Sequence, residues 1–213
     1  MLKQALAEAE TSVTAGGKKK EYDIEKSGCT ATLAYVKDKT VSVAWLGHII
    51  AYVGRAKGDG VEAHEIVQPH LPSVEEEKKR IEGCKGAVRK WAIDVVGEVG
   101  ELSVWYGEGH EKSGMREPGV PMSRCIGCLD AKGIGVSGEP SCSKYELQDG
   151  DKFIVICSSG VSRVLDKQKV VDTMFKHGTC GKHGAKKLAS AAEEIWLERF
   201  TAENTTAVVL YFV

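Results

Sequence analysis

Apolar and polar residues alternate along the chain in patterns that predict helices in some segments and strands in others. Apolar positions at helical spacing appear in three segments, which are residues 2–13, 166–177 and 186–199. A fourth helix is predicted from Ser73 to Gly83 by its start and stop signals. Glu76 follows Ser73 by three positions, a capping-box pattern that predicts the helix start at Ser73. The polar residues 14–27 predict a loop after the first helix.

Short runs rich in apolar and β-branched residues predict the strands. They are residues 29–36, 41–45, 49–53, 153–157 and 206–212, with two more strands inside residues 87–106. The links between the first three strands are too short for a parallel crossover, which predicts an antiparallel meander. Because the strands come in blocks with helices between them, and no regular βαβ alternation is present, we expect an α+β layered sandwich.

Composition places the chain among folded intracellular proteins. Its 213 residues suffice for one domain with a sizeable core. The 29 Lys and Arg against 30 Asp and Glu create no global field, so neither nucleic acid nor a membrane is an expected partner. The sequence has no apolar signal segment and no run of about 20 apolar residues. The 7 cysteines, an odd number at irregular spacing, indicate reduced thiols; we expect a cytoplasmic location, with the nucleus left open.

Two short clusters carry residues that bind metals. Cys125 and Cys128 form a Cys-x-x-Cys pair, which suits half of a zinc site or a redox pair, but no second pair stands at a matching spacing. His177, Cys180 and His183 offer three transition-metal ligands spaced three positions apart, without a visible fourth. For both clusters the alternative interpretation is an ordinary loop.

Six segments resemble, in order, motifs of the protein phosphatase 2C family. Gly28-Cys29-Thr30-Ala31 resembles its Gly-(Ser/Cys)-Thr-Ala strand entry, and Ser123-Arg124 with Gly127 resembles its Ser-Arg-x-x-Gly-Asp element. The other segments are residues 43–48, 70–86, 145–171 and 191–212. The resemblance covers about residues 27–213, and motifs that occur in order are more specific than any one motif. Residues 1–26 are expected to form a preceding helix and linker.

The resemblance implies one domain over residues 1–213 with an α-β-β-α sandwich, in which two antiparallel sheets are flanked by helices. Elements that the family carries before the Gly-x-Thr-Ala strand are expected to be lacking. The family hydrolyses phosphoserine and phosphothreonine with two divalent ions, Mg²⁺ or Mn²⁺, which bridge the attacking water and neutralise the phosphate. Such hard cations need carboxylate oxygens in octahedral geometry.

Most acids that the resemblance places at the metal site are replaced in this sequence. The replaced positions are His48, Cys128 and Ser159, whereas Glu203 keeps an acid. The sequence also contains no Asp-Gly-His segment, which the family uses for metal binding. A hydroxyl cannot replace an anionic bridge to Mg²⁺, and imidazole prefers softer metals. The resemblance therefore implies that no metal cofactor is bound.

We accordingly expect a catalytically inactive pseudophosphatase domain that acts as a protein-binding or regulatory scaffold. The alternative is a weak or partner-completed Mg²⁺- or Mn²⁺-dependent protein Ser/Thr phosphatase, with Glu203 as a remaining ligand. A third hypothesis is a sensor that binds a transition metal through its thiols or through the cluster from His177 to His183. Arg124 is a candidate anion-binding remnant, for which a structural salt bridge is the other interpretation.

Missing family strands would leave open sheet edges, whose unpaired N–H and C=O groups favour association. The strands over residues 41–45 and 206–212 are the candidates for such edges. The expected partner is a protein, either a second copy in a homodimer or a different chain.

Overall fold

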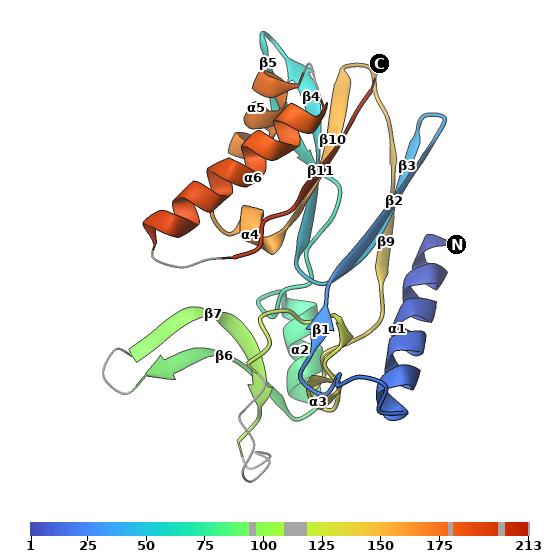
Figure 1. Cartoon of the computed structure of the whole chain (residues 1–213), viewed down its shortest axis with the longest axis vertical. Helices are drawn as coiled ribbons and strands as arrows, with labels where there is room; N and C mark the ends of the chain where they lie inside the picture. Colours follow the sequence, from blue (N-terminus) through green and yellow to red (C-terminus); the bar gives the residue numbers. More distant parts are fainter. Residues whose placement is uncertain (94–96, 109–118, 179–180, 200–202, 213) are drawn as a thin grey trace. The chain divides into compact units, whose positions relative to one another are not determined.

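The fold is known from a computed structural model, which describes residues 1–93, 97–108, 119–178, 181–199 and 203–212 (Figure 1). The chain divides into two compact units. Unit 1 comprises Met1–Leu33, Ala44–His48 and Pro69–Cys142, and unit 2 comprises Ala34–Val43, Ile49–Gln68 and Ser143–Val213. The single domain over residues 1–213 stays a prediction.

Helices and antiparallel sheets make up both units, which confirms the predicted α+β class. The helices are α1 (Leu2–Lys18), α2 (Glu75–Gly83), α3 (Leu129–Lys132), α4 (Ser159–Ser162), α5 (Lys167–His177) and α6 (Gly181–Glu198). The strands are β1 (Gly28–Cys29), β2 (Ala31–Lys37), β3 (Thr40–Leu46), β4 (Ile49–Lys57), β5 (Gly60–Glu65), β6 (Gly86–Ile93), β7 (Gly97–Tyr106), β8 (Ile126–Gly127), β9 (Ser141–Glu146), β10 (Asp151–Ser158) and β11 (Ala207–Tyr211). The sheet orders are β11-β10-β4-β5, β2-β3-β9, β1-β8 and β6-β7.

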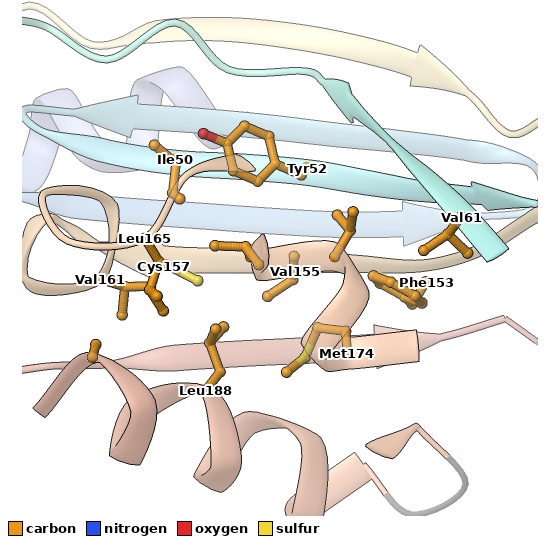
Figure 2. Close-up of a cluster of buried hydrophobic side chains, with 13 residues drawn as sticks. Ile50, Tyr52, Val61, Phe153, Val155, Cys157, Val161, Leu165, Met174 and Leu188 are labelled. Atoms are coloured by element: carbon orange, nitrogen blue, oxygen red, sulfur yellow. The ribbon is translucent and has the colours of Figure 1, made fainter. Parts of the chain in front are cut away.

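Unit 2 is built on the sheet β11-β10-β4-β5, along one side of which α5 and α6 lie (Figure 1). Alternate residues of β10 point into one apolar cluster with helix residues, and Figure 2 shows Phe153 and Val155 there beside Met174 and Leu188. Burying a side chain of this size contributes about 1.5–3 kcal/mol. The start of α5 is set by Asp166, whose carboxylate accepts a hydrogen bond from the Lys169 N–H at 3.0 Å.

Two smaller apolar clusters lie among the described residues of unit 1. One joins α2, the β6-β7 hairpin and residues 120–136 around Ile81 and Val104, both fully buried. The other packs α1 through Leu6 against Leu46 and Ile126. The helices of the described residues include none with the length and apolar character that a membrane span requires.

Three local predictions are wrong at helix ends. Helix α1 continues to Lys18, beyond the predicted residue 13 and into the predicted loop. Helix α6 begins at Gly181, before the predicted residue 186. Helix α2 begins at Glu75 with Val74 as its N-cap and without a side-chain cap, so the capping box at Ser73 does not form. A turn in which the Val74 N–H donates to the Leu71 carbonyl at 3.0 Å precedes this helix and sets its later start.

The predicted meander of the first three strands is also wrong. Strands β3 and β4 belong to different sheets, and β4 pairs with β10 and β5 instead. Gly47, at a φ of +95°, turns the chain between them, a conformation that a residue with a Cβ adopts only at a cost. Strand β3 lies between β2 and β9, so it is not the predicted open edge, whereas β11 is at the edge of its sheet.

Candidate functional site

The Ser-Arg element of unit 1 is bound to a buried carboxylate. Arg124 donates to Glu77 Oε1 from Nε at 3.0 Å and from Nη2 at 2.6 Å. Ser123 Oγ and Arg80 Nη2 donate to Glu77 Oε2 at 2.5 and 2.8 Å. Burial alone would raise the pKa of Glu77, but the hydrogen bonds from Arg80, Arg124 and Ser123 outweigh burial and lower this pKa to about 2. The carboxylate is therefore held as an anion inside the protein.

The nitrogens of Arg124, a candidate anion-binding residue, are already bonded to acceptors within the protein. Its remaining guanidinium nitrogen, Nη1, donates to the Glu139 carbonyl at 3.0 Å and faces Ser141 Oγ at 3.4 Å. An incoming anion at Arg124 would have to compete with the carboxylate of Glu77, which accepts hydrogen bonds from Nε and Nη2. The geometry supports the structural salt bridge as the role of Arg124.

A buried histidine completes this part of unit 1. The ring of His70 stacks on Trp45 with centroids 5.7 Å apart, and its Nδ1 accepts a hydrogen bond from the Gly47 N–H at 3.0 Å. Nε2 carries the proton and lies 2.9 Å from Ser141 Oγ. Burial, together with the positive charge of Arg124, lowers the pKa of His70 to about 4, so the ring is neutral at physiological pH.

Four positions match metal ligands of the family, and two of them, His48 and Cys128, lie in unit 1. His48 lies between β3 and β4, after Gly47, and is buried. Cys128 is also buried, with 7% of its surface exposed, and adopts a left-handed φ of +53°. Its Sγ lies against Gly28, where an added Cβ would come within 2.5 Å of the sulfur. Neither side chain is an oxygen ligand of the kind that Mg²⁺ requires.

The other two positions lie in unit 2, on segments that run side by side. Ser159 is the first residue of α4, directly after β10, and the Ser158 N–H donates to the Thr206 carbonyl at 3.0 Å. Glu203 precedes this contact in the chain, and its carboxylate accepts a hydrogen bond from Arg163 Nη1. Unit 2 therefore brings the two segments together, but it directs the one remaining acid toward a guanidinium.

These donors do not fit a pair of hard divalent cations. The four positions offer an imidazole, a thiol, a hydroxyl and one carboxylate that is already ion-paired. In the part of the chain that the structure describes, no group of three or more His, Cys, Asp or Glu side chains is placed to hold a metal ion. Of the transition-metal candidates, His177 ends α5 and His183 lies in α6, while Cys180 lies outside the described residues.

His70, Glu77 and Arg80 lie within the matched segment 70–86 and were not predicted as site residues. The one signal was their place in the segment 70–86, whose order along the chain matched the family pattern. Their contacts with Ser123, Arg124 and Ser141 join segments far apart in the sequence. Local spacing carries no information on such contacts.

Comparison with known proteins agrees with the resemblance. A family model described as "Protein phosphatase 2C" matches residues 1–206, so the match includes α1. "Probable protein phosphatase 2C 72" of Arabidopsis thaliana is 29% identical over 195 residues, which cover 90% of this chain and 56% of that protein. "Probable protein phosphatase 2C 61" of the same plant is 30% identical over 183 residues, 85% of this chain and 53% of that protein. The chain spans about half the length of the curated relatives it matches.

Solved structures show the same fold. The serine-threonine phosphatase 2C from Toxoplasma gondii aligns with a TM-score of 0.77 and 18% identity, over 96% of this chain and 64% of that one. A sex determining protein of C. elegans aligns with a TM-score of 0.73 and 20% identity, over 98% of this chain and 45% of that one. At these identities the alignments establish the fold and confirm the predicted fold class.

Proposed function

Because this chain belongs to the protein phosphatase 2C family, we propose that it is a catalytically inactive member that acts by binding another protein, as a regulatory scaffold. The observation that carries the proposal is the ion pair between Glu203 and Arg163 in unit 2. Glu203 is the one acid left among the matched metal positions, and a guanidinium occupies it. A divalent cation at this carboxylate would have to displace Arg163 against its positive charge.

The neighbouring position strengthens the proposal. Ser159, on the segment beside Glu203, carries a neutral hydroxyl where a two-metal site requires an anionic bridge. A metal-bridged mechanism needs several carboxylates at the same time, since each ion keeps near-ideal octahedral geometry with oxygen ligands. One paired carboxylate and one hydroxyl fall short of that requirement.

The buried side chains of Glu77 and His70 in unit 1 have their hydrogen-bond partners within the protein, which suits a scaffold. In unit 1 the buried Glu77 is held by Arg80, Ser123 and Arg124, and His70 is held between Gly47 and Ser141. These bonds stabilise the segments of unit 1 without any metal. Hydrogen bonds of this kind are sufficient to hold the shape of a binding protein. Metal-dependent phosphate hydrolysis would in addition need carboxylate ligands at the replaced positions.

The edge strand β11 supports the proposal of a protein partner. Among the described strands β11 pairs with β10 alone, and its segment Ala207–Tyr211 contains no charged residue and no proline. Val208 and Leu210 are 60% and 46% exposed on the face turned away from α5 and α6. An uncharged edge strand with exposed apolar residues associates with another strand. We propose that a second copy of this chain pairs there, β11 against β11, because the uncharged strand is complementary to itself.

Metal binding and phosphatase activity test the proposal directly. Titration calorimetry of the purified chain with Mn²⁺ is expected to show no stoichiometric binding, and a phosphothreonine peptide with millimolar Mn²⁺ is expected to release no phosphate. Two tight Mn²⁺ sites, or turnover above about 0.1 s⁻¹ against an enzyme range of roughly 1–10³ s⁻¹, would overturn it.

A second candidate function is a phosphatase completed by carboxylates from another polypeptide. It is favoured by the carboxylate of Glu203, whose side chain is 31% exposed. This function requires Mn²⁺-dependent hydrolysis that appears only with the completing polypeptide and disappears in Glu203→Gln. Hydrolysis that persists in Glu203→Gln would assign the activity to the added polypeptide instead.

A further inference from the structure

One face of helix α6 in unit 2 carries a hollow whose lining side chains all bear hydrogen-bond donors. The hollow has a volume of about 220 Å³ and is lined by His183, Lys186, Lys187 and Ser190. Their spacing, i, i+3, i+4 and i+7, places the four side chains on the same side of the helix. His183, Lys186 and Lys187 are exposed to solvent, and Ser190 is half-buried.

Another face of α6 packs into the core of unit 2 and fixes the direction in which the hollow points. Gly184, Leu188 and Ala192 are buried on that face, and Figure 2 shows Leu188 directed into the apolar cluster. A Cβ at Gly184 would come within 2.7 Å of the Tyr211 hydroxyl, so the helix lies close against β11 there. Because rotation of the helix would break this packing, the lining of the hollow stays on the solvent side.

The lysines of the hollow have no acidic partner within the protein. Among the residues that the structure describes, neither Lys186 nor Lys187 forms an ion pair. The first turn of α6 carries no acid, and the acids of this helix, Glu193, Glu194 and Glu198, lie in its second half. Cations in the first half and acids in the second half oppose the helix dipole, which favours the reverse arrangement. The two lysines are therefore unfavourable for the helix unless an anion offsets their charge.

The end of α5 adds basic residues near the start of α6. Its last turn carries Lys176 and His177, and α6 begins at Gly181, four positions after His177. Four residues span at most about 14 Å, so the two basic segments lie close together. This part of unit 2 therefore attracts anions, although the net charge of the whole chain is only −1.

The lining matches the chemistry of a phosphate group. A phosphate monoester carries a charge of about −1.5 to −2 at neutral pH and three strong acceptor oxygens. Two lysine ammonium groups, an imidazole N–H and a hydroxyl supply a donor for each oxygen, and lysine binds phosphate as a point charge. A carboxylate offers less charge and one oxygen fewer. The volume lies below the roughly 300–1,000 Å³ of sites for drug-sized ligands, so the hollow suits one small group.

We propose that this face of α6 binds a single phosphate group, carried as a monoester on a protein or present as free phosphate. A polyanion such as nucleic acid does not fit, because Glu194 follows Ser190 by one turn on the same face. The next phosphate along the helix would meet that carboxylate. The site shares no residue with the four metal positions, so it stands whether or not the proposed scaffold function holds.

Nuclear magnetic resonance of the full, isotope-labelled chain tests the proposal. The chain is titrated at constant ionic strength with inorganic phosphate, with an acetylated tripeptide that has a central phosphoserine, and with the same peptide unphosphorylated. Both phosphate carriers are expected to shift the amide signals of residues 183–190 in a saturable way. Tighter binding of the phosphopeptide assigns the site to phosphorylated proteins, and equal or tighter binding of inorganic phosphate assigns it to free phosphate. Equal shifts with the unphosphorylated peptide, or no saturable shift at residues 183–190, would overturn the proposal.

Paired substitutions separate the hollow from general charge attraction. Lys186→Gln combined with Lys187→Gln is expected to weaken phosphate binding about tenfold. Lys167→Gln combined with Lys169→Gln removes the same charge from exposed positions of α5 and is expected to change the Kd by less than about twofold. Phosphate is also expected to raise the Tm of the wild type and of the α5 variant, but not that of the α6 variant. Equal weakening in the two double variants would mean that overall charge attracts phosphate, and would overturn the proposal.

Discussion

Glu77 and Arg124 lie 47 positions apart in the sequence, yet Arg124 Nη2 lies 2.6 Å from Glu77 Oε1 in unit 1. The carboxylate is 5% exposed and the guanidinium 19%. The pair joins α2 to the segment that carries the Ser-Arg element, next to Cys125. In this protein the Ser-Arg element is therefore part of the internal hydrogen-bond network of unit 1.

Glu77→Gln is expected to lower the free energy of unfolding by about 3 kcal/mol, because it leaves Arg80 and Arg124 as partly buried cations without their carboxylate. Urea denaturation followed by circular dichroism measures the change. Glu75→Gln on the same helix removes an exposed pair with Lys79 and is expected to change stability by less than about 0.5 kcal/mol. Equal effects of the two substitutions would show that the buried network contributes no special stability.

Acid is expected to destabilise the protein through His70 before it affects Glu77. The pKa of His70 falls from its ordinary value of 6.5 to about 4 in the folded state. Between these values the unfolded chain binds a proton that the folded chain does not, so stability is full above pH 6.5 and is lost as pH falls toward 4. The pKa of Glu77 falls from 4.5 to about 2 in the folded state, so the stability that Glu77 contributes is lost at lower pH, between 4.5 and 2.

His70→Gln provides the measurement for this pH dependence. Unfolding free energies of the wild type and of the variant are compared in urea from pH 7 down to about pH 4, the folded-state value. The wild-type curve is expected to fall more steeply than that of the variant in this range. Parallel curves would mean that His70 titrates normally and that its contacts with Gly47 and Ser141 do not exclude the charged ring.

Leu188→Ala is expected to destabilise unit 2 by about 2–5 kcal/mol, since Leu188 is fully buried in the cluster of Figure 2 and its truncation leaves a cavity. Leu197 lies on the same helix but is 64% exposed, so Leu197→Ala is the matched control. That control is expected to change stability by less than about 0.5 kcal/mol. Thermal unfolding measures the change in Tm of each variant relative to the wild type. Equal decreases in Tm for the two variants would contradict a core role for Leu188.

Ser159→Asp is expected to leave the chain without phosphatase activity. Restoring one carboxylate does not rebuild a two-metal site, because residues that act together contribute non-additively. Ser162→Asp on the same short helix supplies the same charge as a control. Phosphate release from a phosphothreonine peptide in Mn²⁺ is measured for both. Mn²⁺-dependent hydrolysis by Ser159→Asp alone would mean that further metal ligands are in place, contrary to the proposed inactivity.

Val208→Lys is expected to prevent self-association through β11, because a charge on an edge strand opposes strand pairing. Light scattering at micromolar concentration compares it with the wild type, which is expected to be a dimer. Leu197→Lys makes a similar apolar-to-cation change on α6 and is expected to remain dimeric. A monomeric wild type would remove the second copy as occupant of β11 and leave a different protein as the partner.

The sequence by itself determined those features that depend on neighbours along the chain. The apolar period of residues 166–177 predicted α5 correctly, because the apolar stripe of a helix is set by residues that lie within a few turns of each other. Alternation within residues 87–106 predicted two strands, which correspond to β6 and β7, but their pairing with each other was not predicted. The order of the motifs predicted the family, and the replaced positions Cys128 and Ser159 raised the question of activity.

Only the tertiary structure decided which distant segments meet. Spacing placed β4 in a meander with β3, but β4 pairs with β10, about a hundred residues further on in the chain. In the same way Glu77 binds Arg124, and Glu203 binds Arg163. Periodicity reports which face of an element is buried, not which partner covers it. The partner is chosen by the packing and charge of residues that come together only when the chain folds.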